Sequence, residues 1–318
     1  MDTVNKYLSI IVTVYNEEKY LPECIDSLLK TDGIDDSEII IVDDGSKDES
    51  GIIADKYAES HGNIRVIHKD NGGAADARNM GMKNASGKYI SFCDGDDLIV
   101  PEHFAKVIKA LKDDDIDIVL WDGELVDESG KTLNRKDSNY YRYVCFEGDS
   151  VLTGKELLAK QLKMTGDYPV TVCFGAYKKE FLIGGNFFFE TGIVHEDDLW
   201  VPKVLLNAAS IKHISEKLYL YRVHDSSVMN PEKKDWSKHI ESLIKIYPEL
   251  YGYADEVLEE GELKKLVEAN FTRRYLHWIY TYDFYRYGYG DKIDKEKLKK
   301  TAGRFRDKVR TRLLCLKG

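Results

Sequence analysis

Short apolar runs alternate with amphipathic stretches along the first third of the chain. Mainly apolar, β-branched runs at residues 8–14, 38–42, 64–68 and 89–93 have the composition of strands buried on both faces of a parallel sheet. Between them, apolar residues recur every three or four positions, which is typical of helices with one buried face. Ser46 is the expected N-cap of the second helix. The order β-α-β-α-β-α-β predicts an open, doubly wound α/β sheet with right-handed crossovers.

A polar cluster follows each of the four predicted strands, at residues 13–17, 43–46, 71–78 and 94–97. The carboxyl ends of parallel strands meet at one edge of a sheet, so these clusters are expected to border a single crevice. No G-x-G-x-x-G follows the first strand, which disfavours a dinucleotide-binding Rossmann domain. Acids at that place favour a nucleotide held through its base, its ribose and a metal-bridged diphosphate.

The last of these clusters, in GKYISFCDGDD at residues 87–97, places Asp94, Asp96 and Asp97 together after a buried strand. Like charges this close repel one another unless a cation neutralises them, which points to a divalent metal with oxygen ligands. For an isolated D-x-D, a solvated acidic turn is the simpler explanation. The three other polar clusters at the same edge favour the metal site.

Five segments, in this order, resemble the successive signatures of family 2 glycosyltransferases: VTVYNEEKYLPECIDSLL, IIIVDDGSKDES, NGGAADARNMGM, GKYISFCDGDD and HEDDLW. The resemblance covers residues 7–228. It implies an A-type glycosyltransferase fold, which is Rossmann-like with a mostly parallel central sheet flanked by helices. It also implies an inverting enzyme that uses a nucleotide-sugar, with a UDP-sugar favoured, and a Mn or Mg ion.

The resemblance also assigns roles to single residues. Thr13, Tyr15 and Asp44 would hold the nucleoside, with Asp44 accepting a hydrogen bond from the uracil ring, and Glu17 would border that pocket. Asp94 would lie near the ribose or the donor sugar. The donor-binding set is completed by Gly95, Asn71, Gly73 and Arg78, of which the last three would line the pyrophosphate and the sugar. Taken singly, these residues have simpler explanations as a helix cap, a turn and an ion pair.

Metal and catalytic roles follow from the same resemblance. Asp96 would hold the ion that bridges the diphosphate, and His224 would complete its ligands after a segment closes over the donor. In HEDDLW, Asp197 is the expected base that deprotonates the acceptor hydroxyl, and Glu196 would position the acceptor or the base. A simpler explanation of these acids is that they stabilise the N-terminus of a helix. Asp198, next to Asp197, is the alternative candidate for the base.

The last quarter of the chain differs in composition. We predict a catalytic domain at residues 1–230, with a nucleotide-sugar half at about 1–100 and an acceptor half at about 101–230. Residues 231–318 are expected to form a helical appendage rich in aromatic residues, with a basic tail. That tail either attaches to the anionic inner face of the plasma membrane, with a lipid-linked acceptor, or packs as a solvated helix pair or a homodimer contact.

Composition narrows the class of protein further. A net charge of -10 disfavours general nucleic-acid binding, and five scattered cysteines in a chain of 318 residues indicate neither a disulfide framework nor a zinc site. No apolar run approaches the ~20 residues that span a bilayer, and the first residues show no secretory leader, so we expect a cytoplasmic protein.

The sequence therefore predicts a metal-dependent, inverting hexosyl- or N-acetylhexosaminyltransferase that adds a sugar to a saccharide acceptor, lipid-linked or protein-linked. Such a reaction would serve polysaccharide or glycoprotein glycan synthesis. A nucleotidyltransferase and a catalytically silent nucleotide-sugar-binding module are the alternatives. The first would carry a Gly-rich basic loop after its first strand, where this chain has YNEE. The donor sugar, acceptor and linkage are left open, because specificity depends on pocket shape.

Overall fold

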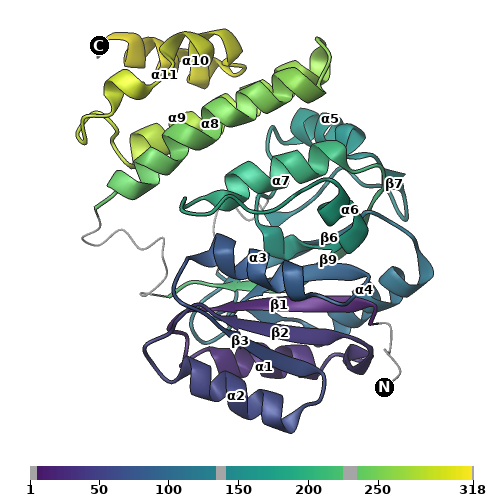
Figure 1. Ribbon diagram of the computed structural model, residues 1–318. Coiled ribbons are helices and arrows are strands. Elements are labelled where there is room, and N and C mark those ends of the chain that lie inside the picture. Colours follow the sequence, from purple (N-terminus) through teal and green to yellow (C-terminus); the bar gives the residue numbers. More distant parts are fainter. Residues whose placement is uncertain (1–5, 134–140, 225–234, 317–318) are drawn as a thin grey trace.

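The computed structural model describes residues 6–133, 141–224 and 235–316, which fold around one nine-stranded sheet (Figure 1). Its strands follow the order β3-β2-β1-β4-β8-β6-β9-β5, and β7 pairs with β9. The strands are β1 (Leu8–Val14), β2 (Glu38–Asp43), β3 (Ile64–His68), β4 (Tyr89–Asp94), β5 (Leu98–Ile99), β6 (Ile118–Val126), β7 (Val151–Leu152), β8 (Gly175–Lys178) and β9 (Ile211–Arg222).

The first four strands are parallel, as their apolar sequences predict. Val12 of β1 lies opposite Ile41 of β2 on one side and Cys93 of β4 on the other, and all three residues are buried. Beyond β4 the sheet becomes mixed, because β8 runs antiparallel to both of its neighbours while β6 and β9 are parallel. The strand β8 begins at Gly175, directly after a 3-10 turn at Val172–Phe174.

Helices cover both faces of this sheet. In Figure 1, α1 and α2 lie on one side of β1–β3 and α3 lies on the other. Gly81 of α3 packs so closely on Ile11 that an added Cβ would lie 2.4 Å from it. The helices of the first 230 residues are α1 (Leu21–Leu29), α2 (Ser50–Ser60), α3 (Ala74–Asn84), α4 (Pro101–Asp113), α5 (Gly154–Met164), α6 (Lys179–Gly184) and α7 (Glu196–Asn207).

The predicted N-cap of α2 is wrong. The helix begins four residues after Ser46, at Ser50. Ser46 instead belongs to a turn, where its backbone N–H donates to Asp43 Oδ1 at 3.0 Å and its hydroxyl accepts from the backbone N–H of Asn16 at 3.0 Å. An Asx turn therefore competes successfully with helix capping at this serine.

Four further helices complete the described chain: α8 (Ser237–Val257), α9 (Glu262–Thr281), α10 (Lys295–Thr301) and α11 (Phe305–Leu316). The helix α8 packs on α7 and α9 packs on α5, so Ile240 and Phe271 share one continuous core with the sheet residues. The predicted C-terminal helices are thus confirmed. The predicted domain boundary at residue 230 falls outside the described residues. Among the helices that the structure describes, none has the length and apolar character to cross a bilayer.

Candidate active site

The polar clusters after β1, β2 and β4 meet at one edge of the sheet, as the strand order requires. Thr13 pairs in register with Asp94, and its hydroxyl donates to Asp94 Oδ1 at 3.0 Å. The N–H of Gly95 donates to the carbonyl oxygen of Thr13 at 2.9 Å. Tyr15, two residues after Thr13, is 47% exposed. Three of the predicted donor-binding residues therefore form one hydrogen-bonded group beside an accessible tyrosine ring.

The Asp44 carboxylate fastens the loop that follows β3. Its Oδ1 accepts from Lys69 Nζ at 2.6 Å and from the N–H of Gly72 at 2.9 Å. Its Oδ2 accepts from the N–H of Gly73 at 2.7 Å and from Asn71 Nδ2 at 3.1 Å. Gly73 reaches this position with a φ of 88°, in the region that favours glycine. The structure thus brings Asp44, Asn71 and Gly73 together.

These contacts limit what else Asp44 can bind. A carboxylate offers about four lone-pair positions, and four donors already use them. The residue is 3% exposed. A uracil N–H would therefore have to replace one of these donors. Of these four donors, the Lys69 ammonium is the one that can move away from Asp44 while the backbone stays in place. It also donates to Asp76, at 2.8 Å, and would keep that partner.

The acids after β4 divide into two kinds. Asp96 remains partly exposed at the crevice, with 22% of its side chain accessible. Asp97 is buried, where its Oδ2 accepts from the Tyr219 hydroxyl at 2.6 Å and its Oδ1 from the N–H of Arg222 at 2.7 Å. Burial, with Asp96 and Asp94 nearby, holds the pKa of Asp97 well above its usual range. The expectation that three carboxylates face the site is corrected, because Asp97 anchors β9 instead.

Glu17, Asp96 and His224 form a cluster with metal-ligand chemistry. One ligand atom from each lies within 4.8 Å of the others, and His224 Nε2 is 2.9 Å from Asp96 Oδ2. Burial and the Asp96 charge raise the pKa of Glu17 to about 8. Two carboxylates and an imidazole this close together fit a divalent cation. The sequence placed Glu17 beside the nucleoside, whereas the structure brings it to the two predicted metal ligands.

Arg78 joins the donor and acceptor sides of the site. Its side chain is 4% exposed; Nη2 is 2.9 Å from Asp94 Oδ1 and Nη1 is 2.5 Å from Glu196 Oε1. Asp197 Oδ1 lies 3.8 Å from the same Nη1. The Nε of Arg78 is buried and has no hydrogen-bond partner among the described residues, so a water molecule or a ligand could accept a hydrogen bond from it. A single guanidinium thus neutralises carboxylates from β4 and α7.

The three acids of HEDDLW form the first turn of α7 and lie in different surroundings. Asp197 keeps 30% of its side chain exposed and lies near Arg78, whereas Asp198 is buried and lies 3.5 Å from Arg274 Nη1 of α9. Burial and the neighbouring Glu196 charge hold the pKa of Asp197 well above its usual range. His195 precedes them with a φ of 64°, a strained conformation of the kind that is often found at functional sites. The structure therefore separates Asp197 from Asp198.

Residues of the C-terminal helices contact this acidic segment on its buried side. Arg274 also donates to Asp167 Oδ1 at 2.6 Å, which ties α9 to the loop after α5. His195 Nε2 lies 3.1 Å from His239 Nδ1 of α8 and 3.2 Å from the Tyr282 hydroxyl, and its ring packs on Trp278. Burial lowers the pKa of His195 to about 4. Residues far along the chain thus position the backbone that carries Glu196 and Asp197.

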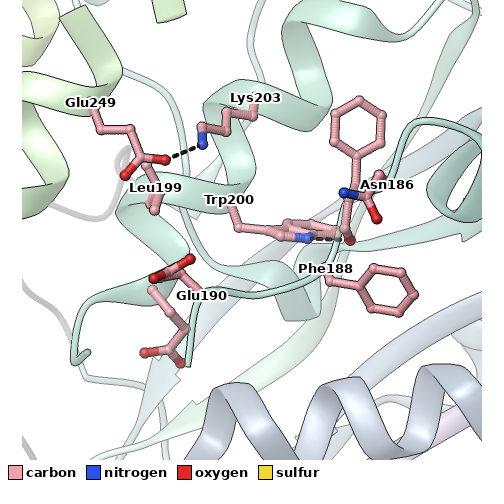
Figure 2. Close-up of a pocket in the computed structure, with 9 residues that line it drawn as sticks. Asn186, Phe188, Glu190, Leu199, Trp200, Lys203 and Glu249 are labelled. Atoms are coloured by element: carbon pink, nitrogen blue, oxygen red, sulfur yellow. Dashed lines mark hydrogen bonds and ion pairs between the residues drawn. The ribbon is translucent and has the colours of Figure 1, made fainter. Parts of the chain in front are cut away.

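A recess borders Glu196 on the side away from the strand ends. Figure 2 shows it between α7 and the segment before it, with Trp200 at its base and the Lys203–Glu249 ion pair linking α7 to α8. Phe188 and Glu190 belong to the same lining. Aromatic faces beside carboxylates are surfaces on which a sugar ring can stack and donate hydrogen bonds.

A comparison with protein families agrees with this geometry. Residues 9–183 match the model of glycosyl transferase family 2. The chain belongs to that family. One family relative is the glycosyltransferase GlyG from Streptococcus pneumoniae serotype 4, which is 33% identical over 244 residues, or 74% of this chain and 78% of that protein.

Solved structures show the same fold. The S. aureus TarS fragment in complex with UDP-GlcNAc has a TM-score of 0.73 and 22% identity, with 98% of this chain and 88% of that chain covered. The mannosyltransferase PcManGT from Pyrobaculum calidifontis, solved with GDP-Man and Mn2+, has a TM-score of 0.55 and 17% identity, with 98% and 86% covered. The predicted A-type glycosyltransferase fold of this family 2 chain is confirmed.

Sequence reasoning missed three residues that shape the site. Lys69 holds Asp44, Tyr219 holds Asp97, and Arg274 holds Asp198. Lys69 adjoins the NGG motif and could have been included with it. Tyr219 and Arg274 lie more than 70 residues from their partners, and no local pattern marks them.

Proposed function

We propose that this family 2 glycosyltransferase moves a sugar with inversion from a UDP-sugar to a hydroxyl of a saccharide acceptor. The observation that carries this proposal is the position of Asp197, which lies beside Arg78 at the crevice while Arg78 also binds Asp94. We propose that this carboxylate acts as the base on the acceptor side, opposite the donor loops. Asp197 would take the proton of the acceptor hydroxyl as its oxygen bonds to the anomeric carbon, and the bond from that carbon to the diphosphate would break.

Asp197 is the base in this proposal, and Asp198 is not. Asp198 faces Arg274 in the interior, where an acceptor hydroxyl has no access. Asp197 keeps 30% of its side chain exposed beside Arg78, where an acceptor hydroxyl can reach it. Glu196 is held by Arg78 at 2.5 Å and would orient the acceptor.

Glu17, Asp96 and His224 would hold the divalent ion. An imidazole among the ligands favours Mn over Mg, because Mg prefers oxygen ligands. When bound, such an ion supplies positive charge to the leaving diphosphate. The Mn2+-containing PcManGT complex supports this assignment by fold likeness.

The remaining donor contacts follow the predicted set. Tyr15 and Asp44 would lie at the nucleoside, and the uracil ring would replace Lys69 as a hydrogen-bond donor to Asp44. Asn71, Gly73 and Arg78 would line the diphosphate and sugar, and Thr13, Asp94 and Gly95 would border the ribose. The TarS complex with UDP-GlcNAc supports a UDP-sugar, and N-acetylglucosamine is the first sugar to test.

On the acceptor side, we propose that residues 101–230 and the recess beside Glu196 receive the growing saccharide. Residues 1–100 would form the donor half, and residues 231–318 a helical unit that steadies α7. The enzyme would work on a lipid-linked or protein-linked glycan at the inner face of the plasma membrane, with α10 and α11 toward the bilayer.

Release of nucleoside diphosphate tests the enzyme proposal. A panel of UDP-, GDP- and TDP-sugars is supplied with Mn2+, with Mg2+ or with a chelator, using the wild-type protein and Asp96→Asn. Asp113, an exposed residue at the end of α4, provides the control Asp113→Asn. We expect metal-dependent release from a UDP-sugar that Asp96→Asn lowers at least ~100-fold and the control leaves unchanged. Donor binding without turnover, with acceptors present, would instead identify a silent binding module.

A further inference from the structure

Helix α11 carries an exposed apolar stripe. Phe305 is 83% exposed, Val309 38%, Leu313 50% and Leu316 82%. Their spacing of four, four and three residues aligns them along one side of the helix. Scattered exposed apolar residues are ordinary, but four in line on a 12-residue helix form a surface that favours contact with another apolar phase.

The stripe faces away from the protein. Asp307, Thr311 and Leu314 form the buried edge of α11, and the hydroxyls of Tyr280 and Tyr285 donate to backbone carbonyls of this helix. At about 100° per residue, the stripe spans an arc of roughly 80° that lies nearly opposite this edge. Figure 1 shows α11 beyond α9, at the end of the molecule far from α1 and α2.

Basic side chains border the stripe on both sides. By the same helical geometry, Arg306 and Arg310 lie along one border and Lys308 and Arg312 along the other. The acid of this helix, Asp307, is buried. Residues 291–318 contain 11 Lys and Arg against 4 Asp and Glu, a net charge of +7, so the other 290 residues carry -17.

We infer that α11 docks on an anionic lipid surface, with the stripe at the boundary between headgroups and acyl chains and the flanking cations on lipid phosphates. The inference deepens the proposed function and rests on its membrane location. The acidic remainder of the protein would be repelled by the same surface, which orients this end toward it.

A second copy of the chain fits the stripe less well. A symmetric contact through α11 would bring the flanking cations of both copies together, and like charges across an interface oppose association. Four apolar side chains are also few beside the ~20–30 residues that each partner contributes to a standard interface.

Vesicle flotation of the full chain tests this inference. Phosphatidylglycerol-containing vesicles are compared with neutral phosphatidylcholine vesicles, using the wild type, Phe305→Ser/Leu316→Ser and Arg306→Gln/Arg312→Gln. The control Ile52→Ser/Met164→Ser removes two exposed apolar residues, 56% and 62% accessible, elsewhere on the surface.

We expect the wild type to float with the anionic vesicles and less at high salt. The stripe variant should bind at least ~10-fold more weakly, the charge variant about 25-fold more weakly at roughly fivefold per cation, and the control unchanged. Equal flotation of the stripe variant, or no preference for anionic vesicles, would overturn the inference. So would a doubled solution mass that the stripe variant abolishes, since that result identifies a second copy.

Donor hydrolysis is measured on the same preparations. Hydrolysis without flotation would overturn the docking surface and leave the enzyme proposal standing. Flotation without hydrolysis of any donor would count against the enzyme proposal alone.

Discussion

Replacement of Arg78 by methionine removes the charge that joins the two sides of the site. Methionine keeps much of the apolar volume, but it leaves Asp94, Glu196 and Asp197 around a position with no cation. The contact of Arg78 with Glu196, at 2.5 Å, is buried, and the contact with Asp94, at 2.9 Å, is partly buried. Breaking a buried ion pair by removing one partner costs about 3–5 kcal/mol. At about 2 °C per kcal/mol for a chain of this size, Arg78→Met should lower Tm by roughly 6–10 °C at pH 8.

The loss should depend on pH. Arg78 opposes the forces that raise the pKa of Asp197, so this pKa rises further in the variant. A carboxyl whose pKa is raised in the folded state binds its proton more tightly there than in the unfolded chain. Stability then falls as pH rises above the unfolded pKa of about 4, so the Tm difference from wild type should be smaller at pH 5 than at pH 8.

Thermal unfolding at the two pH values measures this effect, and Arg65→Met is the matched control. Arg65 has 43% of its side chain exposed, and its Nε lies 3.5 Å from Oε2 of the buried Glu38. A long contact from an exposed guanidinium contributes at most about 1 kcal/mol. A Tm change for Arg78→Met no larger than that of the control, or one independent of pH, would refute the idea that Arg78 is the counter-charge of these acids.

Three further predictions follow from the site. Arg274→Met should lower kcat several-fold with little change in the donor KM, because Asp198 and Asp167 lose a shared cation behind α7; a changed KM with constant kcat would contradict this. His195→Asn should reduce the loss of stability at acid pH. The pKa of His195 is about 4 in the folded protein and about 6.5 in the unfolded chain, so the wild type loses up to ~3 kcal/mol of stability as pH falls from 6.5 to 4. Urea unfolding at pH 4.5 and 7 measures this difference. Asp44→Asn should weaken UDP binding at least ~10-fold in calorimetry, because an amide cannot accept from all four donors, and unchanged affinity would exclude Asp44 from organising the nucleoside loop.

The sequence predicted those features that depend on local pattern. The apolar runs of β1, β2 and β4 fixed the parallel half of the sheet, and the polar clusters behind them met at one edge as parallel strands require. The predicted start of α2 was wrong because the Ser46 hydroxyl accepts from the N–H of Asn16, in the loop after β1, while the N–H of Glu49 donates to Glu18.

Features that depend on distant contacts were out of reach. Asp96 and Asp97 are neighbours in a charged motif, yet Asp97 turns inward because Tyr219 and the Arg222 backbone offer it donors. The sequence favoured Asp197 as the base but left Asp198 as an alternative, and Arg274, 76 residues away from Asp198, shows that Asp198 is the buried one. The five motifs and their acidic residues could be named from the sequence, but the partners of these residues could be identified only from the fold.

The central claim is that Asp197 is the base of the transfer. Nucleoside diphosphate release and donor affinity are compared for wild type, Asp197→Asn and Asp198→Asn, with metal present. The account predicts that Asp197→Asn lowers kcat by about 10²–10⁴-fold while donor Kd stays within about twofold, and that Asp198→Asn keeps most of kcat with a lower Tm. Turnover of Asp197→Asn at the wild-type rate, or loss of turnover in Asp198→Asn with an unchanged Tm, would contradict it.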